Sequence, residues 1–226
     1  MRRNAKEDPS LARVPEPLPT QRIAQAVGQK LTLYGVEFQV PWSGKAQVKE
    51  LKRLVRIQFQ QGQFVLLSDP SHGLNRIKVL KENGRSQEVE RVWGSDAVRS
   101  DYALMNAVLH VTPKDITLWM PRIQLVRNST FLMLKTAELA NTQTGLFQYQ
   151  NERVRAFQKG DPAKSPSVVL DAFDDADREY LIFVGRTTGT NGLVKQEDIN
   201  LILSTLKPVQ AIPQADQKRQ TSSGTN

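Results

Sequence analysis

Hydrophobic and polar positions alternate with a period of two in the first third of the chain. In GVEFQVPW (residues 35–42) every second side chain from Val36 to Trp42 is apolar, which predicts a half-buried strand. In LVRIQFQQGQFVLLS (residues 54–68) two such runs flank Gln61-Gly62, which predicts a β-hairpin.

The middle of the chain changes to a helical period. SQEVERVWG (86–94) and SDAVRSDYALMNAVLHV (95–111) both begin at a serine, and one face of the second carries Val98, Tyr102 and Met105. TPKDITLWM (112–120) predicts another helix, because its threonine suits the N-cap and its proline the first helical position. A further helix is expected within 122–140, although FLMLK in that range fits a strand equally well.

The last third predicts a β-meander that ends in a helix. Strands are expected at 145–150, 153–158, 166–173 and 179–185. The helix VKQEDINLILSTLK (194–207) has Glu197 and Asp198 in its first turn and Lys207 in its last, which suits the helix macrodipole. The sequence therefore predicts an α+β fold: a mainly antiparallel sheet packed against helices, with a C-terminal β-meander closed by an amphipathic helix.

The two ends differ in composition from the centre. Residues 1–30 are basic and rich in proline and predict a disordered segment with a short helix over 20–28. Residues 209–226 are polar and predict a disordered tail. A single α+β domain is accordingly expected over 31–208.

The amino-acid composition excludes several kinds of functional site. The chain of 226 residues has no cysteine, which excludes disulfides, thiolate catalysis and cysteine-ligated zinc or iron–sulfur centres. It has no apolar run of membrane-spanning length and no signal peptide, so a cytoplasmic location is expected, or a periplasmic one if an anchor or signal is missing. Neither histidine, His72 nor His110, has a metal-ligand partner four residues on, and no catalytic, cofactor-binding or metal-binding residue is predicted.

The net charge of +8 is concentrated at the ends of the chain. Residues 1–30 hold six Lys or Arg against three Asp or Glu, and residues 207–226 hold three against one. More than half of the excess therefore lies in these two end segments, where charge usually serves solvation, and specific nucleic-acid binding is not favoured.

One internal stretch is strongly basic. KAQVKELKRLVR (residues 45–56), read as a helix, gathers its basic side chains on one face, a possible surface for polyanions or an anionic membrane. The candidate residues are Lys45, Lys49, Lys52, Arg53 and Arg56. Because no aromatic residue interleaves to stack on bases or enter lipid, we favour the alternative that this is a solvated face.

Two further motifs have a structural interpretation. The acidic run DAFDDADRE (171–179) lacks the glycine of a calcium loop and lies between two strongly apolar segments, so it predicts a hairpin turn. GRTTGTNG (185–192) lacks the lysine of a P-loop and predicts a flexible connection between a strand and a helix.

Between Leu31 and Pro208 the chain resembles a group of uncharacterised bacterial proteins. The segments that carry the resemblance are YGVEFQVPW, SDYALMNAVLHVTP, TGLFQYQ, FQKGDP, VVLDAFDDADREYLIFVG and DINLILSTLKP. The meander closed by a helix is also similar to the PsbP-type α/β/α sandwich, which implies a scaffold for docking and assembly. Members of the bacterial group often have an N-terminal membrane segment, which this sequence lacks.

Together these observations predict a non-catalytic accessory or binding module for a protein or small-molecule ligand. The rival hypothesis is a hydrolase-type enzyme that uses two buried carboxylates. A deep pocket lined by carboxylates with strongly raised pKa values would favour the enzyme.

Overall fold

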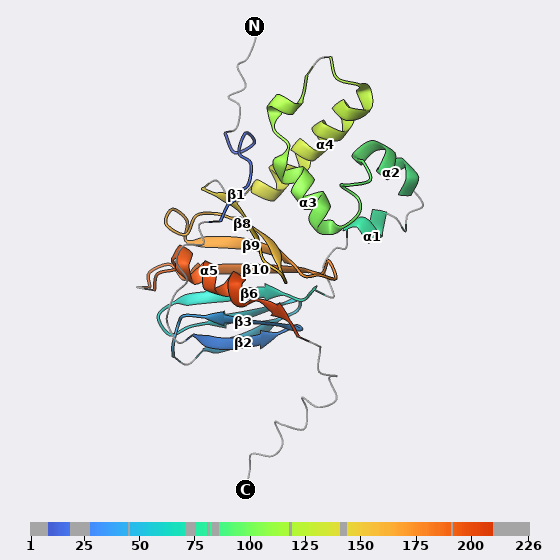
Figure 1. Cartoon of the computed structure of the whole chain (residues 1–226). Coiled ribbons are helices and arrows are strands. Elements are labelled where there is room, and N and C mark those ends of the chain that lie inside the picture. Colours follow the sequence, from blue (N-terminus) through green and yellow to red (C-terminus); the bar gives the residue numbers. More distant parts are fainter. Residues whose placement is uncertain are drawn as a thin grey trace.

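The computed structural model describes residues 9–18, 28–44, 46–70, 76–80, 82, 86–117, 119–140, 144–190 and 192–209. Helices α1 to α4 form a layer on one side of a large sheet, and a small sheet with helix α5 lies on the other side (Figure 1). The fold is α+β with a mostly antiparallel sheet, as the sequence predicts.

The large sheet has eight strands in the order β1-β7-β8-β9-β10-β6-β5-β4. Their bounds are Glu16–Pro17, Leu146–Gln150, Arg155–Lys159, Ser167–Phe173, Glu179–Arg186, Gln63–Ser68, Leu54–Gln58 and Gln47–Leu51. All neighbours pair antiparallel except β1, which pairs with β7 in parallel. Strands β7 to β10 are consecutive neighbours, so the predicted C-terminal meander is confirmed.

The main core lies between the large sheet and the small one. The small sheet consists of β2 (Gln29–Leu33), β3 (Val36–Val40) and β11 (Lys207–Pro208). Helix α5 (Gln196–Thr205) packs on β3, and Ile199 and Ile202 are fully buried there. Burial of this apolar stripe, worth about 1.5–3 kcal/mol for each large side chain, explains why the helix closes the sheet.

The helical layer covers the opposite face of the large sheet over β7, β8 and β9. Its helices are α1 (Arg76–Leu80), α2 (Ser86–Trp93), α3 (Asp101–His110) and α4 (Arg122–Leu139). Tyr102 of α3 stacks on Phe157 of β8, with ring centroids 5.4 Å apart, and meets Phe173 of β9 edge to face. These aromatic contacts fix the position of α3 on the sheet.

The predicted helices 95–111 and 112–120 are shorter than expected. Ser100 is the N-cap of α3, and its hydroxyl accepts a hydrogen bond from the Ala103 amide, so residues 95–98 form a turn instead. Of the second prediction only the 3₁₀ turn η3 (Pro113–Asp115) forms. The ambiguous FLMLK segment is helical within α4, since one face of that helix is buried.

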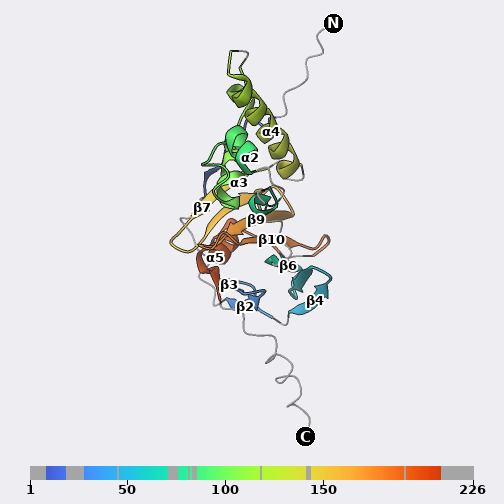
Figure 2. The same cartoon turned by 90° about the vertical axis from the view of Figure 1, so that its right-hand side faces the viewer.

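The prediction of a helix for KAQVKELKRLVR (residues 45–56) is wrong. Strands β4 and β5 form a hairpin there, with Lys52 and Arg53 in its two-residue turn. Val55 and Ile57 are buried, whereas β4 is exposed along its whole length at the edge of the sheet (Figure 2). Pairing of β5 with β6 in the adjoining hairpin decides between the two periods that this stretch can satisfy.

Part of the N-terminal segment predicted as disordered belongs to the fold. Glu16 and Pro17 pair with Phe147 and Gln148 of β7, and Leu18 is buried. The predicted helix over 20–28 and the predicted tail over 209–226 lie, except for Gly28 and Val209, outside the described residues. Within the part of the chain that the structure describes, no helix is long and apolar enough to cross a membrane.

Candidate functional site

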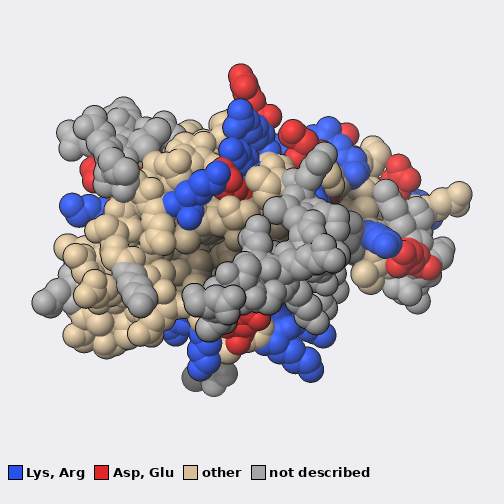
Figure 3. All heavy atoms as spheres, turned by 90° about the horizontal axis from the view of Figure 1, so that it is seen from below, with Lys and Arg blue, Asp and Glu red and all other residues tan. Residues whose placement is uncertain are grey.

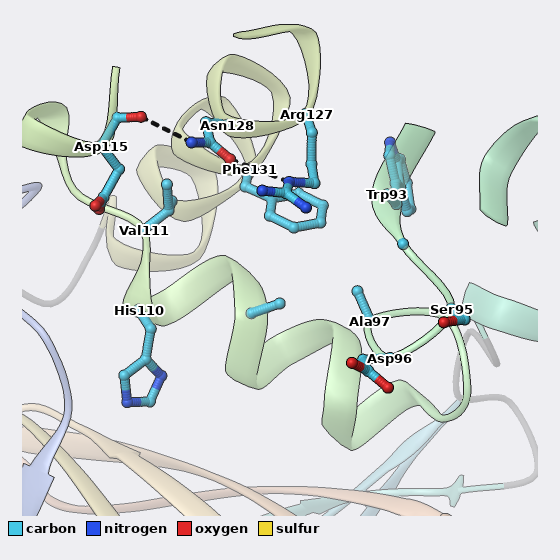
Figure 4. Close-up of a pocket in the computed structure, with 12 residues that line it drawn as sticks. Trp93, Ser95, Asp96, Ala97, His110, Val111, Asp115, Arg127, Asn128 and Phe131 are labelled. Carbon is cyan, nitrogen blue, oxygen red and sulfur yellow. Dashed lines mark hydrogen bonds between the residues drawn. The ribbon is translucent and has the colours of Figure 1, made fainter. Parts of the chain in front are cut away.

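An open pocket of about 470 Å³ lies in the helical layer. Three elements build it: the connection between α2 and α3, the C-terminal half of α3 with η3, and the first half of α4 (Figure 4). Its lining residues are Trp93, Gly94, Ser95, Asp96, Ala97, Ala107, His110, Val111, Asp115, Arg127, Asn128 and Phe131.

Local hydrogen bonds hold the wall formed by η3 against α4. The carboxylate of Asp115 accepts hydrogen bonds from the amide and the hydroxyl of Thr112, at 2.7 and 2.8 Å, which turns the chain after α3. The buried side chain of Asn128 donates to the Asp115 carbonyl at 2.7 Å. Asn128 therefore ties α4 to η3 and fixes one side of the pocket.

The floor of the pocket is apolar, and the guanidinium group of Arg127 lies at its edge. Trp93 and Phe131 meet edge to face with ring centroids 5.7 Å apart, and Ala97 is buried beside them. The Arg127 Nε donates to the Asn128 Oδ1 at 3.2 Å, and among the described residues no carboxylate lies within ion-pairing distance of this guanidinium. The terminal nitrogens of Arg127 can therefore serve a ligand that also fills the apolar floor.

His110 lies at the exposed end of α3. Its Nδ1 is 2.8 Å from the Asn106 carbonyl oxygen, within the same helix, so the ring is held at the rim of the pocket. His72, the other histidine of the chain, lies outside the described residues.

A buried lysine lies behind the pocket. The Lys135 Nζ donates to the carbonyls of Val111, at 2.7 Å, and Arg13, at 2.5 Å, which places a positive charge at the C-terminal end of α3. Burial lowers the pKa of Lys135 to about 8, and the negative charge of Asp115 opposes this shift.

Two carboxylates with raised pKa values, those of Asp171 and Glu179, lie elsewhere, between the sheet and the helices α1 and α4. Lys159 of β8 lies 2.7 Å from the Asp171 carboxylate of β9 and 2.9 Å from that of Glu138 of α4. Arg76 of α1 bridges Glu138, at 3.4 Å, and Glu179 of β10, at 3.1 Å. We call these five residues the buried ionic network.

Burial shifts the pKa of two carboxylates in this network. It raises the pKa of Asp171, against the opposing effect of Lys159, and it raises the pKa of Glu179 to about 7, against the opposing effect of Arg76. Neither residue lines the pocket described above. The carboxylates with raised pKa values, which a hydrolase would need, therefore lie outside that pocket.

The acidic run forms the predicted hairpin turn between β9 and β10. The Asp174 carboxylate accepts from the amides of Ala176 and Arg178, and that of Asp177 accepts from the amides of Asp101 and Tyr102 at the start of α3. The turn thus also caps α3. Within the described ranges, no group of three histidine or acidic side chains could hold a metal ion.

The described part of GRTTGTNG connects β10 to α5 and packs on the turn between β5 and β6. The Thr187 amide donates to the Gly62 carbonyl at 2.8 Å. Gly62 has a φ of +99°, and a Cβ there would lie 2.1 Å from the Thr190 hydroxyl oxygen, so only glycine fits. The local contacts are those of a structural connection.

The predicted basic residues lie on the β4–β5 hairpin and form no helical face. Lys49 pairs with Arg56 across the strands, and Lys52 and Arg53 are exposed in the turn, whereas Lys45 lies outside the described residues. The Arg56 guanidinium turns onto the Phe64 ring, 4.6 Å from its centroid, and donates to Gln58. The exposed lysine of β4, Lys49, hinders edge-to-edge pairing of sheets, which gives it a structural role.

Basic and acidic side chains are interspersed on another face of the molecule. Seen from the side of the small sheet, Lys and Arg are interspersed with Asp and Glu around a mostly uncharged centre (Figure 3).

We predict weak, nonspecific binding of polyanions by this hairpin. For about four phosphates neutralised, the log–log dependence of duplex-DNA affinity on salt should have a slope of roughly −3 to −4. Titration of the full chain with duplex DNA and with anionic vesicles, at several salt concentrations, measures this. Submicromolar binding near physiological salt that is lost in Lys49→Glu/Arg53→Glu, but kept in the equally charged control Arg91→Glu/Lys114→Glu, would contradict the prediction.

Comparisons with protein-family models, with curated proteins and with solved structures find no match for this chain. The resemblance seen in the sequence is therefore supported only at the level of a mixed α/β architecture with an eight-stranded sheet and helices.

No pattern in the sequence indicated the pocket residues as a group. Trp93, Arg127, Asn128 and Phe131 come from two helices and carry no motif spacing. Only the packing of α2 and α4 around α3 brings them together.

Proposed function

We propose that the protein is a non-catalytic binding module that recognises a peptide segment of a partner protein through the pocket in the helical layer. The observation that carries the proposal is the Trp93–Phe131 floor beside the Arg127 guanidinium. Tryptophan and arginine in partly desolvated pockets supply most of the energy in many protein interfaces. The resemblance to a scaffold for docking and assembly agrees with this function.

The pocket favours a segment with one apolar side chain followed by an anionic group. The apolar side chain would pack on Phe131, Trp93 and Ala107, and a carboxylate would accept hydrogen bonds from Arg127. The exposed carboxylate of Asp96 at the opposite rim favours a basic or amide donor on the other flank of the same segment.

The hydrolase alternative has less support. Asp171 is held by Lys159, and Glu179 by Arg76, so both carboxylates already have cationic partners within the protein. A raised pKa in such a network is the expected result of burial and does not require a catalytic role.

We expect peptides selected against the pocket to lose affinity when it is altered. Selection of a phage-displayed library of random peptides on the full chain should yield ligands whose binding, measured by fluorescence anisotropy, weakens at least about tenfold in Arg127→Ala and in Ala107→Phe, which fills the floor. Arg91→Ala, an exposed arginine outside the pocket, is the matched control. Peptides that bind Ala107→Phe as tightly as the wild-type protein would contradict the proposal, provided that circular dichroism shows both variants folded.

A further inference from the structure

The solvent-facing side of α4 is apolar, although the helix lies at the surface. Half of the ten exposed large hydrophobic side chains in the described part of the chain fall within residues 119–133. They are Trp119, Ile123, Leu125, Val126 and Met133, with Met133 66 % and Trp119 95 % exposed. A concentration of apolar surface on one element indicates an interaction site, whereas single exposed apolar side chains need no explanation.

The outward residues repeat with alternating spacings of three and four. They are Ile123, Val126, Thr130, Met133 and Ala137, and none of them is charged. This is the heptad spacing of a helix seam that packs against a second helix. The opposite side of α4, with Asn128, Phe131, Lys135 and Leu139, is already buried against the rest of the protein.

The polar groups near this seam are already satisfied. The Thr130 hydroxyl donates to the Val126 carbonyl at 2.8 Å, and the Thr136 hydroxyl donates to the Leu132 carbonyl at 2.9 Å. A second helix could therefore cover this side of α4 without leaving these hydroxyl donors unpaired, which removes a common cost of burial.

The seam of one α4 helix is complementary to the seam of a second α4 helix that runs antiparallel to it. Thr130 stands at its centre, so in an antiparallel pair of α4 helices it meets its own copy. Ile123 then faces Ala137 of the second copy, and Val126 faces Met133, which places large side chains against smaller ones at the ends of the seam.

The distribution of charge along α4 favours the same antiparallel orientation. Helix α4 has no acidic residue in its first turn and no basic residue in its last, and Arg122 stands at its N-terminus, where the helix dipole disfavours a cation. In the antiparallel pair Arg122 lies beside the C-terminal end of the other α4, where a cation is stabilised. A parallel pair would instead place the two Arg122 side chains together.

We propose that α4 is a self-association surface, on which two copies of this chain pack their α4 helices antiparallel across a two-fold axis at Thr130. The same patch meets itself, as in other two-fold dimers. One helix from each copy makes a small interface, so the dimer is weak and depends on concentration. No residue within the seam is charged, whereas the flanking positions hold Arg122 and Arg127 together with Ser129, Leu134 and Thr136. The self-complementary spacing, and not the charge of the flanks, favours a second copy of α4 over a membrane surface.

Sedimentation velocity of the full chain over a range of concentrations tests the surface. The wild-type protein should dimerise, and Val126→Glu and Met133→Glu should each weaken the dimer at least about tenfold without changing the circular dichroism spectrum. Val48→Glu, which changes an equally exposed valine on β4, should not. A wild-type protein that stays monomeric at all concentrations, or that binds neutral or anionic vesicles through Val126 in place of dimerising, would overturn the proposal.

Single cysteines test the geometry, because the chain has none of its own. Under mild oxidation Thr130→Cys should form a disulfide-linked dimer much faster than Val48→Cys. Ile123→Cys alone should not cross-link, but a mixture of Ile123→Cys with Ala137→Cys should give the mixed dimer. Rapid cross-linking of Ile123→Cys to itself indicates a parallel pair and overturns the arrangement.

Discussion

Replacing Lys159 by methionine will destabilise the protein by roughly 3–5 kcal/mol, the cost of breaking a buried ion pair from one side. Lys159 is almost completely buried and lies 2.7 Å from Asp171, whose side chain is only 2 % exposed. Without the ammonium group, Asp171 would be either an unpaired buried charge or a protonated acid with one lost partner. Urea unfolding at neutral pH measures the change in the free energy of unfolding.

A double variant and a surface control separate the ion pair from simple loss of packing. Lys159→Met/Asp171→Asn should recover part of the loss, because no charge is left unpaired, and the double-mutant cycle gives the coupling energy. Lys164→Met removes an exposed lysine that pairs with Asp161 and should change stability by about 0.5 kcal/mol or less. A loss below about 1 kcal/mol in Lys159→Met would show that Asp171 finds another partner.

Stability will increase as the pH falls from 8 to 5, because Glu179 binds its proton more tightly in the folded protein. Burial raises the pKa of Glu179 from 4.5 to about 7. Its contribution is therefore fully present below pH 4.5 and is lost as the pH rises through 7. The expected difference in the free energy of unfolding is roughly 2–3 kcal/mol. The same sign holds for Asp171, Asp101 and Asp198, whose pKa values burial also raises.

Two groups with lowered pKa values have a different dependence on pH. The contribution of Lys135 is present above its ordinary pKa of 10.5 and is lost as the pH falls through about 8. Hydrogen bonds from Lys207 and Lys30 lower the pKa of Glu37, so its contribution is lost only below 4.5. Glu37 therefore does not oppose the effect of Glu179 between pH 5 and 8, and Lys135 opposes it only at the upper end of this range.

Glu179→Gln tests the assignment. The amide keeps an acceptor for Arg76 but cannot titrate, so the variant should lose most of the increase in stability between pH 8 and 5, as measured by urea unfolding at each pH. Glu88→Gln, on the exposed face of α2, should keep the wild-type dependence. An unchanged pH dependence in Glu179→Gln would assign the effect to other groups.

The fold class was predictable because it depends on local patterns. Alternating apolar positions marked β3 and the hairpin of β5 and β6, and the four strands of the meander were placed to within two residues at each end. The final helix was recognisable from its apolar stripe and from the acidic residues in its first turn. It ends at Thr205, however, and Lys207, which was predicted in its last turn, lies in β11 because it pairs with β3. These signals are local, since they reflect one buried face of each element.

The errors arose where contacts between elements outweigh the preference of a single segment. Residues 45–56 fit a helical period, yet β5 forms a hairpin with β6, and β4 then pairs with β5. Residues 95–98 could extend α3, but Ser100 caps the helix and the Asp177 carboxylate binds its first amides from a turn far along the chain. Such a contact leaves no trace in the periodicity of either segment.

Composition and local patterns were sufficient to exclude classes of chemistry and to predict most of the elements. The absence of cysteine excluded thiol and cysteine–metal sites, and the apolar periods specified an antiparallel sheet with helices. Which polar groups are buried, and what they contact, follows from the packing of the folded chain. Arg127 joins Trp93 in a pocket, Lys159 meets Asp171 beneath the helices, and α4 buries one apolar face and leaves the other exposed, because each of these outcomes depends on packing between segments that are distant in sequence.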